Sequence, residues 1–175
     1  TADPAVMKKW TWEIEKSADQ VDFTLEPGET MSVNYDVTVL ATPYSTFSVT
    51  GTIAIENTAS VAATLESVTD AMTGGIEAEV ECGVTFPHEL AAGATLNCTY
   101  GAELPDGDTR TNTATVVTSG AVPGGSGTAG VDFENASVTE VDAEVEVDDD
   151  LAGFLGTVEA VDAPYSFTYG LVFGT

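Results

Sequence analysis

The sequence predicts an all-β protein that consists of one antiparallel β-sandwich followed by an incomplete second β-sandwich. Three observations lead to this prediction. Apolar and polar residues alternate over many short stretches, as they do in strands with one buried face. Glycine and proline turn signals separate these stretches at regular intervals. Finally, the order of motifs in residues 51–101 recurs in residues 127–170, but without the strand that closes the first copy.

The first sandwich is predicted to occupy residues 8–119, because about 100 residues are typical of a seven-stranded unit. Pro43 is expected to end one of its strands, since proline has no amide hydrogen to donate to a neighbouring strand. The first expected strand begins at Trp10, and the others cover residues 31–39, 47–55, 61–68, 76–84, 94–102 and 111–118. Residues 1–7 precede all of them and form an N-terminal arm without a predicted partner.

The second sandwich is predicted to begin after a Gly/Pro-rich linker at residues 120–130, which includes Pro123-Gly124-Gly125-Ser126-Gly127. Residues 131–175 then contain only a partial set of strands. The last expected strand has an apolar and largely aromatic face, formed by Tyr165, Phe167, Tyr169, Leu171 and Phe173. Left uncovered, such a face is an aggregation hazard.

A sandwich that lacks a strand favours the addition of a strand from another chain. We therefore expect residues 165–173 to be the assembly strand, covered by the N-terminal arm (residues 1–7) of a neighbouring copy or donated to that copy. A head-to-tail contact that does not close into a ring builds a filament. The alternatives are an ordinary internal strand in a non-polymeric surface module, or a carbohydrate-binding sandwich that uses Trp10 and Trp12.

The net charge of −25, from 29 acidic residues against four Lys and Arg, excludes several classes of partner. Nucleic-acid binding requires cations to neutralise phosphates, and docking on anionic lipid requires a basic surface. No stretch has the length and purity of a transmembrane helix, so we expect no membrane insertion. The scarcity of lysine is typical of secreted surface proteins.

The two cysteines, Cys82 and Cys98, flank a turn region that contains Pro87 and Gly93. If residues 77–84 and 94–102 are neighbouring strands, the two thiols face each other and form a disulfide. A disulfide implies an oxidising compartment, and hence an extracellular, cell-surface location. The alternative is a pair of buried free thiols.

No enzyme is predicted. The single histidine, His88, follows Pro87 in an expected turn, and no Gly-x-Ser-x-Gly motif accompanies it. The run Gly124 to Gly127 is preceded by a proline and followed by no helix, which excludes a phosphate-binding loop.

Two further sites are suggested by local composition. Asp148, Asp149 and Asp150 form the densest acidic cluster and are candidate ligands for Ca²⁺. No other cofactor is expected. The alternative is a solvated acidic strand face. Asn97 and Asn135 lie in Asn-x-Ser/Thr sequences and are candidate glycosylation sites.

The order of several short motifs resembles the Ig-like conserved-repeat domains of bacterial and archaeal surface proteins. The motifs are Ile14-Glu15-Lys16-Ser17-Ala18-Asp19, Leu25-Glu26-Pro27-Gly28-Glu29-Thr30, Val68-Thr69-Asp70, Leu90-Ala91-Ala92-Gly93 and Thr111-Asn112-Thr113-Ala114-Thr115-Val116. The resemblance covers residues 8–119 well and residues 127–175 only as a truncated second copy. It implies a secreted Ig-like sandwich of the kind used in stalks, adhesins and surface layers.

The resemblance also implies a candidate isopeptide cross-link. In some cell-surface Ig-like domains a lysine on the first strand is joined to an asparagine on the last strand, with a buried acid assisting. The corresponding residues here are Lys16, Asn112 and Asp70. The chemistry requires an apolar surrounding that favours the neutral amine. The alternative is an exposed lysine and an asparagine that bonds to a turn.

Overall fold

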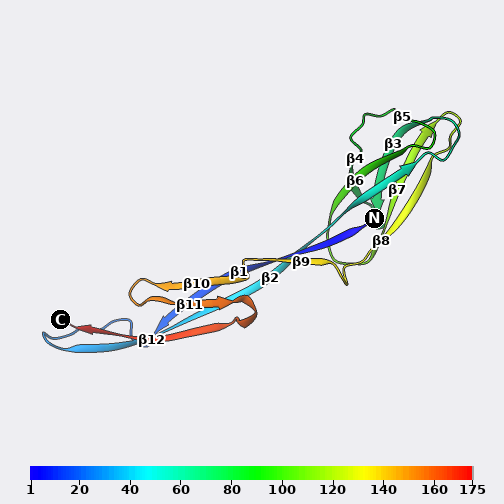
Figure 1. Cartoon of the computed structure of the whole chain (residues 1–175). Coiled ribbons are helices and arrows are strands. Elements are labelled where there is room, and N and C mark those ends of the chain that lie inside the picture. Colours follow the sequence, from blue (N-terminus) through cyan, green and yellow to red (C-terminus); the bar gives the residue numbers. More distant parts are fainter. Residues whose placement is uncertain (175) are drawn as a thin grey trace. The chain divides into compact units, whose positions relative to one another are not determined.

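The structure, a computed structural model, describes residues 1–174 and confirms an all-β, sandwich-like fold (Figure 1). A short 3₁₀ turn, η1 (Ala160–Asp162), lies before the last strand. Within residues 1–174, no helix is long and apolar enough to cross a membrane. The strands are β1 (Asp3–Ala18), β2 (Thr30–Glu56), β3 (Ala63–Met72), β4 (Ile76–Glu81), β5 (His88–Leu90), β6 (Thr95–Leu104), β7 (Arg110–Ser119), β8 (Gly125–Val131), β9 (Ser137–Val141), β10 (Glu144–Asp149), β11 (Gly153–Glu159) and β12 (Tyr165–Gly174).

The chain divides into two compact units, and their boundaries differ from those predicted from the sequence. Unit 1 consists of residues 1–7 and 46–139, and unit 2 consists of residues 8–45 and of the chain from Glu140 onward. The expected division into residues 8–119 and 131–175 is therefore wrong. The reason is that β1 and β2 are long strands, and each contributes residues to both units.

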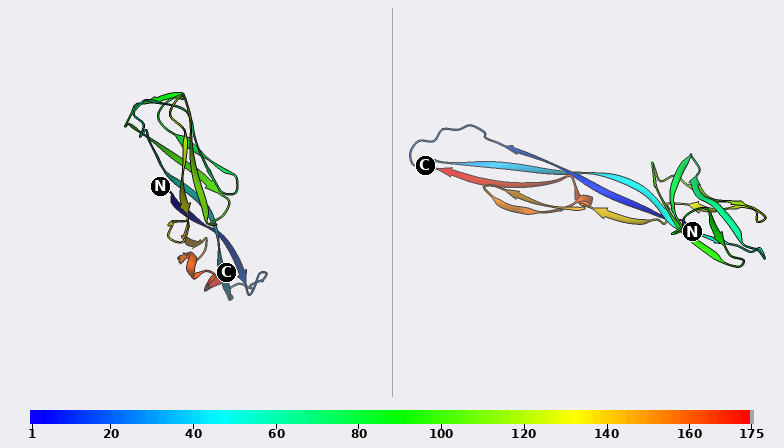
Figure 2. Two further views of the ribbon diagram at one scale, coloured as in Figure 1. Left: turned by 90° about the vertical axis from the view of Figure 1, so that its right-hand side faces the viewer. Right: turned by 90° about the horizontal axis from the view of Figure 1, so that it is seen from above.

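Unit 1 contains a curled antiparallel sheet in which six strands follow one another in the order β8–β7–β3–β4–β6–β2 (Figure 2). β4 joins the two layers, because its first residues pair with β3 and its last residues pair with β6. The short β5 pairs with the start of β3 and contains His88, which was expected in a turn. β8 forms one end of this series, and at the other end β2 is followed by β1, whose first residues also belong to unit 1.

The core of unit 1 is built from the inward-facing residues of this sheet. It includes Val49 and Ile53 of β2, Leu65 of β3, and Leu96 and Tyr100 of β6, each at most 9% exposed. Alternate residues of these strands point outward, which matches the period-two pattern of the sequence. Cys82 and Cys98 form the predicted disulfide next to the β4–β6 pairing.

Residues 120–130, predicted to be a linker, instead provide most of β8. Gly125–Val131 pair with Arg110–Val116 of β7 in a regular antiparallel register. At Gly124, a Cβ atom would collide with the carbonyl oxygen of Val116. The glycine here reflects the close approach of two backbones, and not a flexible connection.

The expected break at Pro43 is also wrong, because β2 continues from Thr30 to Glu56. The pairing of β2 with β12 ends at Val39, and its pairing with β6 begins at Phe47. Pro43 is exposed and lies between these two paired stretches, where neither β12 nor β6 requires an amide hydrogen from it. A proline at such an edge position does not interrupt a strand.

Unit 2 combines a sheet with a separate β10–β11 hairpin. β12 pairs with Thr30–Val39 of β2, and β1 lies between β2 and β9. The core is small: Val37 and Val39 of β2 pack with Val147 and Val158 of the hairpin, each at most 4% exposed. Strands from the beginning of the chain thus pair and pack with the C-terminal strands to form unit 2.

The aromatic face of β12 is covered within the chain, which corrects the expectation that it awaits a neighbour. Phe167 and Tyr169 pack on the core of unit 2, and the Tyr169 ring stacks on that of Tyr35 at 5.3 Å. Phe173 lies 5.6 Å from Phe23 between ring centroids. Among the five residues of the face, Tyr165 is exposed, and Phe167, Tyr169, Leu171 and Phe173 are half-buried.

Candidate functional site

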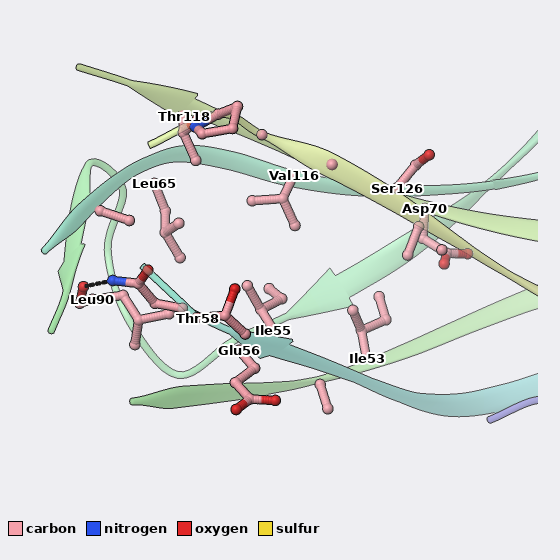
Figure 3. A pocket seen from close by; sticks show the side chains of 18 of the residues that line it. Ile53, Ile55, Glu56, Thr58, Leu65, Asp70, Leu90, Val116, Thr118 and Ser126 are labelled. Atoms are coloured by element: carbon pink, nitrogen blue, oxygen red, sulfur yellow. Dashed lines mark hydrogen bonds between the residues drawn. The ribbon is translucent and has the colours of Figure 1, made fainter. Parts of the chain in front are cut away.

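An open groove lies in unit 1 between β2 and β8. It encloses a cavity of about 610 Å³, lined mainly by residues of β2, β3, β7 and β8 (Figure 3). Within the described residues no strand pairs β2 with β8 across this gap. The position corresponds to that of a missing strand in a sandwich.

The edge of β2 presents free backbone groups to the groove. The backbone carbonyl of Thr52 points toward the N-terminus of the chain and accepts a 2.8 Å bond from the Thr1 ammonium. The backbone amide and carbonyl of Asn57 point to the opposite side of β2, where they bond to Ala94 and Gly93. Since these directions alternate along a strand, the peptide groups of Ala54 and Glu56 point into the groove. They are available for pairing with an added strand.

The edge of β8 is formed largely by glycine. A Cβ atom added at Gly125 or Gly127 would meet no atom within 4 Å, so the space over this face of the strand is open. Among the described residues, β7 is the sole partner of β8. Both walls of the groove are thus strand edges, which are the surfaces that bind extended peptides.

The floor of the groove has an apolar part and a polar part. Leu65, Leu90 and Val116 lie toward one end, and Asp70 lies toward the other (Figure 3). Asp70 and Asn112 are each only 3% exposed. Both carboxylate oxygens of Asp70 and the amide oxygen of Asn112 have no hydrogen-bond partner. Burial raises the pKa of the Asp70 carboxyl above its ordinary value, although the nearby Asn112 side chain opposes this.

The N-terminal arm lies in the chain's own unit 1, next to the polar end of the groove. The Tyr100 hydroxyl donates a 2.8 Å bond to the carbonyl oxygen of Thr1, and Ala2 packs on the core. A side chain at Gly51 would collide with the Thr1 carbonyl and the Tyr100 ring. Gly51 thus makes room for the docked arm. The arm therefore has a partner within its own chain, contrary to the sequence-based map.

The three residues of the proposed cross-link do not come together in this chain. Asp70 and Asn112 lie in unit 1. Lys16 belongs to unit 2, where its ammonium group lies 2.5 Å from the Asp149 carboxylate and 4.8 Å from the centre of the Tyr35 ring. Asp70 and Asn112 lie on neighbouring strands and line the same groove, whereas Lys16 bonds to Asp149.

Asp149 organises the β10–β11 turn. Its Oδ1 atom accepts bonds from the amide groups of Leu151 and Ala152, and its Oδ2 atom accepts bonds from Lys16 and from the Tyr169 hydroxyl. These bonds hold the pKa of the Asp149 carboxyl well below its usual range, with Lys16 as the largest cause.

The bonds of Asp149 do not support the expected calcium site at Asp148, Asp149 and Asp150. Both oxygens of Asp149 are already engaged, whereas Asp148 and Asp150 are exposed. In residues 1–174, no group of three or more acidic, His or Cys side chains is arranged to hold a metal ion. The acidic run instead forms an exposed strand end that is anchored by Lys16.

Acid is expected to weaken unit 2 through Asp149. Because the folded-state pKa of this carboxyl is depressed, its contribution to stability is present above the unfolded value of about 4 and is lost as the pH falls below it. The variant Asp149→Asn should be less stable at neutral pH, and its stability should fall less below about pH 4. Thermal unfolding followed by fluorescence of Trp10 and Trp12, both in unit 2, measures this.

The exposed neighbour provides the control for this experiment. Asp148→Asn should reproduce the pH profile of the unchanged chain, since the Asp148 side chain is exposed. An identical profile for the Asp148 and Asp149 variants would contradict the assigned role of Asp149.

The two candidate glycosylation sites are both accessible. Asn97 is exposed on β6 and pairs through its backbone with Ala54. Asn135 is exposed in the turn after β8, where the Ala136 amide bonds to the Phe133 carbonyl at 3.2 Å. Neither side chain packs in a core, because both are exposed.

Comparison with protein-family models, with curated proteins and with solved structures finds no match. The functional argument therefore rests on the groove itself.

Proposed function

We propose that this protein is the structural subunit of an extracellular filament, in which copies join by β-strand complementation. The observation that carries the proposal is the open groove of unit 1, which has an apolar floor, the free edge of β8 on one side, and the end of β2 beyond the docked Thr1 on the other. A β-strand from another copy would supply both the missing backbone hydrogen bonds and the missing apolar contacts.

The N-terminal arm of a second copy is the proposed occupant. Its residues 3–7 already adopt a strand as the start of β1, and donation to a second copy requires the pairing of this part of β1 with its own β2 to open. A head-to-tail contact of this kind that does not close into a ring produces a filament. The proposed acceptor is therefore the groove of unit 1, and not the aromatic face of β12 that the sequence suggests.

Other features are compatible with an extracellular location. The Cys82–Cys98 disulfide fits an oxidising compartment. The net charge of −25 disfavours non-specific aggregation of folded subunits and binding to nucleic acid. The alternatives, a non-polymeric module of a larger adhesin or stalk and a carbohydrate-binding sandwich, both predict particles that stay dispersed.

Negative-stain electron microscopy of the purified chain tests the proposal. Removing residues 1–7 should abolish filaments, because it removes the donor. The variant Val116→Arg should do the same, because it places a charge on the groove floor. The control is Val117→Arg, at an exposed residue on the opposite face of β7, which should leave filaments intact. Dispersed particles of the unchanged chain would overturn the proposal and favour the non-polymeric alternatives.

A further inference from the structure

β12 has a neighbouring strand on one side only. It pairs with Thr30–Val39 of β2 over its whole length, and among the described residues β2 is its sole strand partner. The peptide groups of an antiparallel strand point alternately to its two sides, so about half of those of β12 point away from β2. The aromatic face of β12 packs on the core of unit 2, but its outer edge is not paired with any described strand.

This edge lacks the features that protect exposed edges in other proteins. Protected edges are short, charged, bulged or interrupted by proline. β12 has ten residues, none of them charged and none of them proline, and its register with β2 is regular throughout. The residues that point away from the core are small and exposed: Ser166, Thr168, Gly170, Val172 and Gly174. An edge of this kind is a template for pairing with a further strand.

The other edge strands of the described residues show that the absence of charge is unusual in this chain. The edge strands β5, β9, β10 and β11 contain the acidic residues Glu89, Glu140, Glu144 and Glu159, respectively. β8 is uncharged like β12, and it borders the groove that we propose to accept a strand. In a chain with a net charge of −25, an uncharged edge is where an approaching copy meets the least repulsion.

A second copy of the same strand fits this edge. It is also uncharged, so the pairing places no acidic residue of one β12 against another. A contact between two identical edges is isologous, and its two-fold axis makes the two strands antiparallel. Residues that lie opposite each other in an antiparallel pair share a face. The aromatic faces of the two strands would therefore form one continuous layer.

We propose that the free edge of β12 is a dimerisation surface, at which β12 pairs antiparallel with β12 of a second copy. The outward peptide groups of each strand then bond to the other strand, and the sheets of the two copies join across the two-fold axis. This surface belongs to unit 2, whereas the groove belongs to unit 1. The inference therefore does not rest on the proposed function.

Sedimentation velocity of the full-length Val116→Arg variant tests the inference, because this variant is designed to block the groove and leaves unit 2 unchanged. We expect dimers whose fraction rises with protein concentration. The dimers should become more stable as NaCl is raised from about 0.1 M to about 1 M, because salt screens the repulsion between two acidic copies.

Charges placed on the edge provide the decisive variants. Thr168→Glu and Val172→Glu, introduced singly into the Val116→Arg chain, bring like charges together at the two-fold contact, and each should weaken dimerisation about tenfold. Ser32→Glu is the matched control, because Ser32 is exposed and pairs with Val172 from the inner side, one strand away from the edge. It adds the same charge and should keep the dimer.

Two further measurements separate loss of the contact from loss of the fold. Unfolding followed by the fluorescence of Trp10 and Trp12, both in unit 2, should show that the monomeric glutamate variants remain folded. Hydrogen exchange should become slower in residues 165–174 as the protein concentration rises. Protection confined to other segments would contradict the assignment of the contact to β12.

The possible failures are distinguishable. Monomers of Val116→Arg at every concentration, or dimers that both glutamate substitutions leave unchanged, would overturn the dimerisation surface and leave the filament proposal standing. Dimers of Val116→Arg, combined with the absence of filaments from the unchanged chain, would support the surface and overturn the proposed function alone.

Discussion

Replacing Leu96 by alanine is expected to lower the free energy of unfolding of unit 1 by about 3 kcal/mol. Leu96 is 9% exposed, faces the core from β6 and does not line the groove, so its removal leaves a cavity within packed strands. Such a cavity adds its own cost to the lost transfer free energy of the side chain. The core that Leu96 contacts consists of unit 1 residues alone.

Urea unfolding followed by far-UV circular dichroism measures this effect. Trp10 and Trp12, the only tryptophans of the sequence, lie in unit 2, so their fluorescence follows the other core separately. We expect the circular dichroism transition to move to lower urea and the tryptophan transition to move less. Thr95→Ala, at the exposed neighbouring position of β6, is the control. A loss below about 1 kcal/mol for Leu96→Ala would contradict the packing described for unit 1.

Removing the disulfide with the double substitution Cys82→Ala and Cys98→Ala is expected to cost unit 1 about 3 kcal/mol. The bond joins residues 16 positions apart, and closing a loop of this size restricts the unfolded chain by roughly that amount. Cys98 is 1% exposed in the core, so the substitution there also removes packing contacts.

The effect of the disulfide is measured by the shift of the urea midpoint under oxidising conditions. Reductant should lower the midpoint of the unchanged chain and leave that of the double variant unaltered. A double variant as stable as the unchanged chain would show that the loop between the two cysteines is already restricted in the unfolded state.

The sequence predicts the strands well wherever one face of a strand is buried. The alternating residues around Val33 and Val37, and those around Leu96 and Tyr100, face a core as expected. The pattern fails at β8, because glycine carries no side chain to show alternation and also occurs in linkers. It fails at Pro43 because the cost of proline depends on which edge of the strand is paired, and sequence alone does not contain that information.

The division into units was not predictable from local patterns. The partners of β12 lie at Thr30–Val39, more than a hundred residues earlier in the chain. Such long-range pairings follow from the fold and leave no local signal. The alternating aromatic residues of β12 indicate a face that must be covered, but they do not show that its partner, β2, belongs to the same chain.

The candidate site was predicted in part. The pairing of Cys82 with Cys98 followed from the expected strand neighbours and is confirmed. Asp70 and Asn112 are brought together at the groove, as the resemblance implied. Lys16 was assigned to them because it lies on an early strand, but β1 continues into unit 2 and places it beside Asp149. The sequence does not predict the groove at this position, because the glycines of β8 also fit a linker.

The length of β2 has a mechanical consequence. β2 pairs with β12 over Thr30–Val39 and with β6 over Phe47–Glu56, and it is one uninterrupted strand between them. A tensile load applied along this strand acts parallel to its neighbours, so the hydrogen bonds of each pairing must shear together instead of opening one after another. Resistance to such a load is governed by the rate of forced unfolding and not by equilibrium stability. In the fibre that we propose, this strand would bear part of the tension.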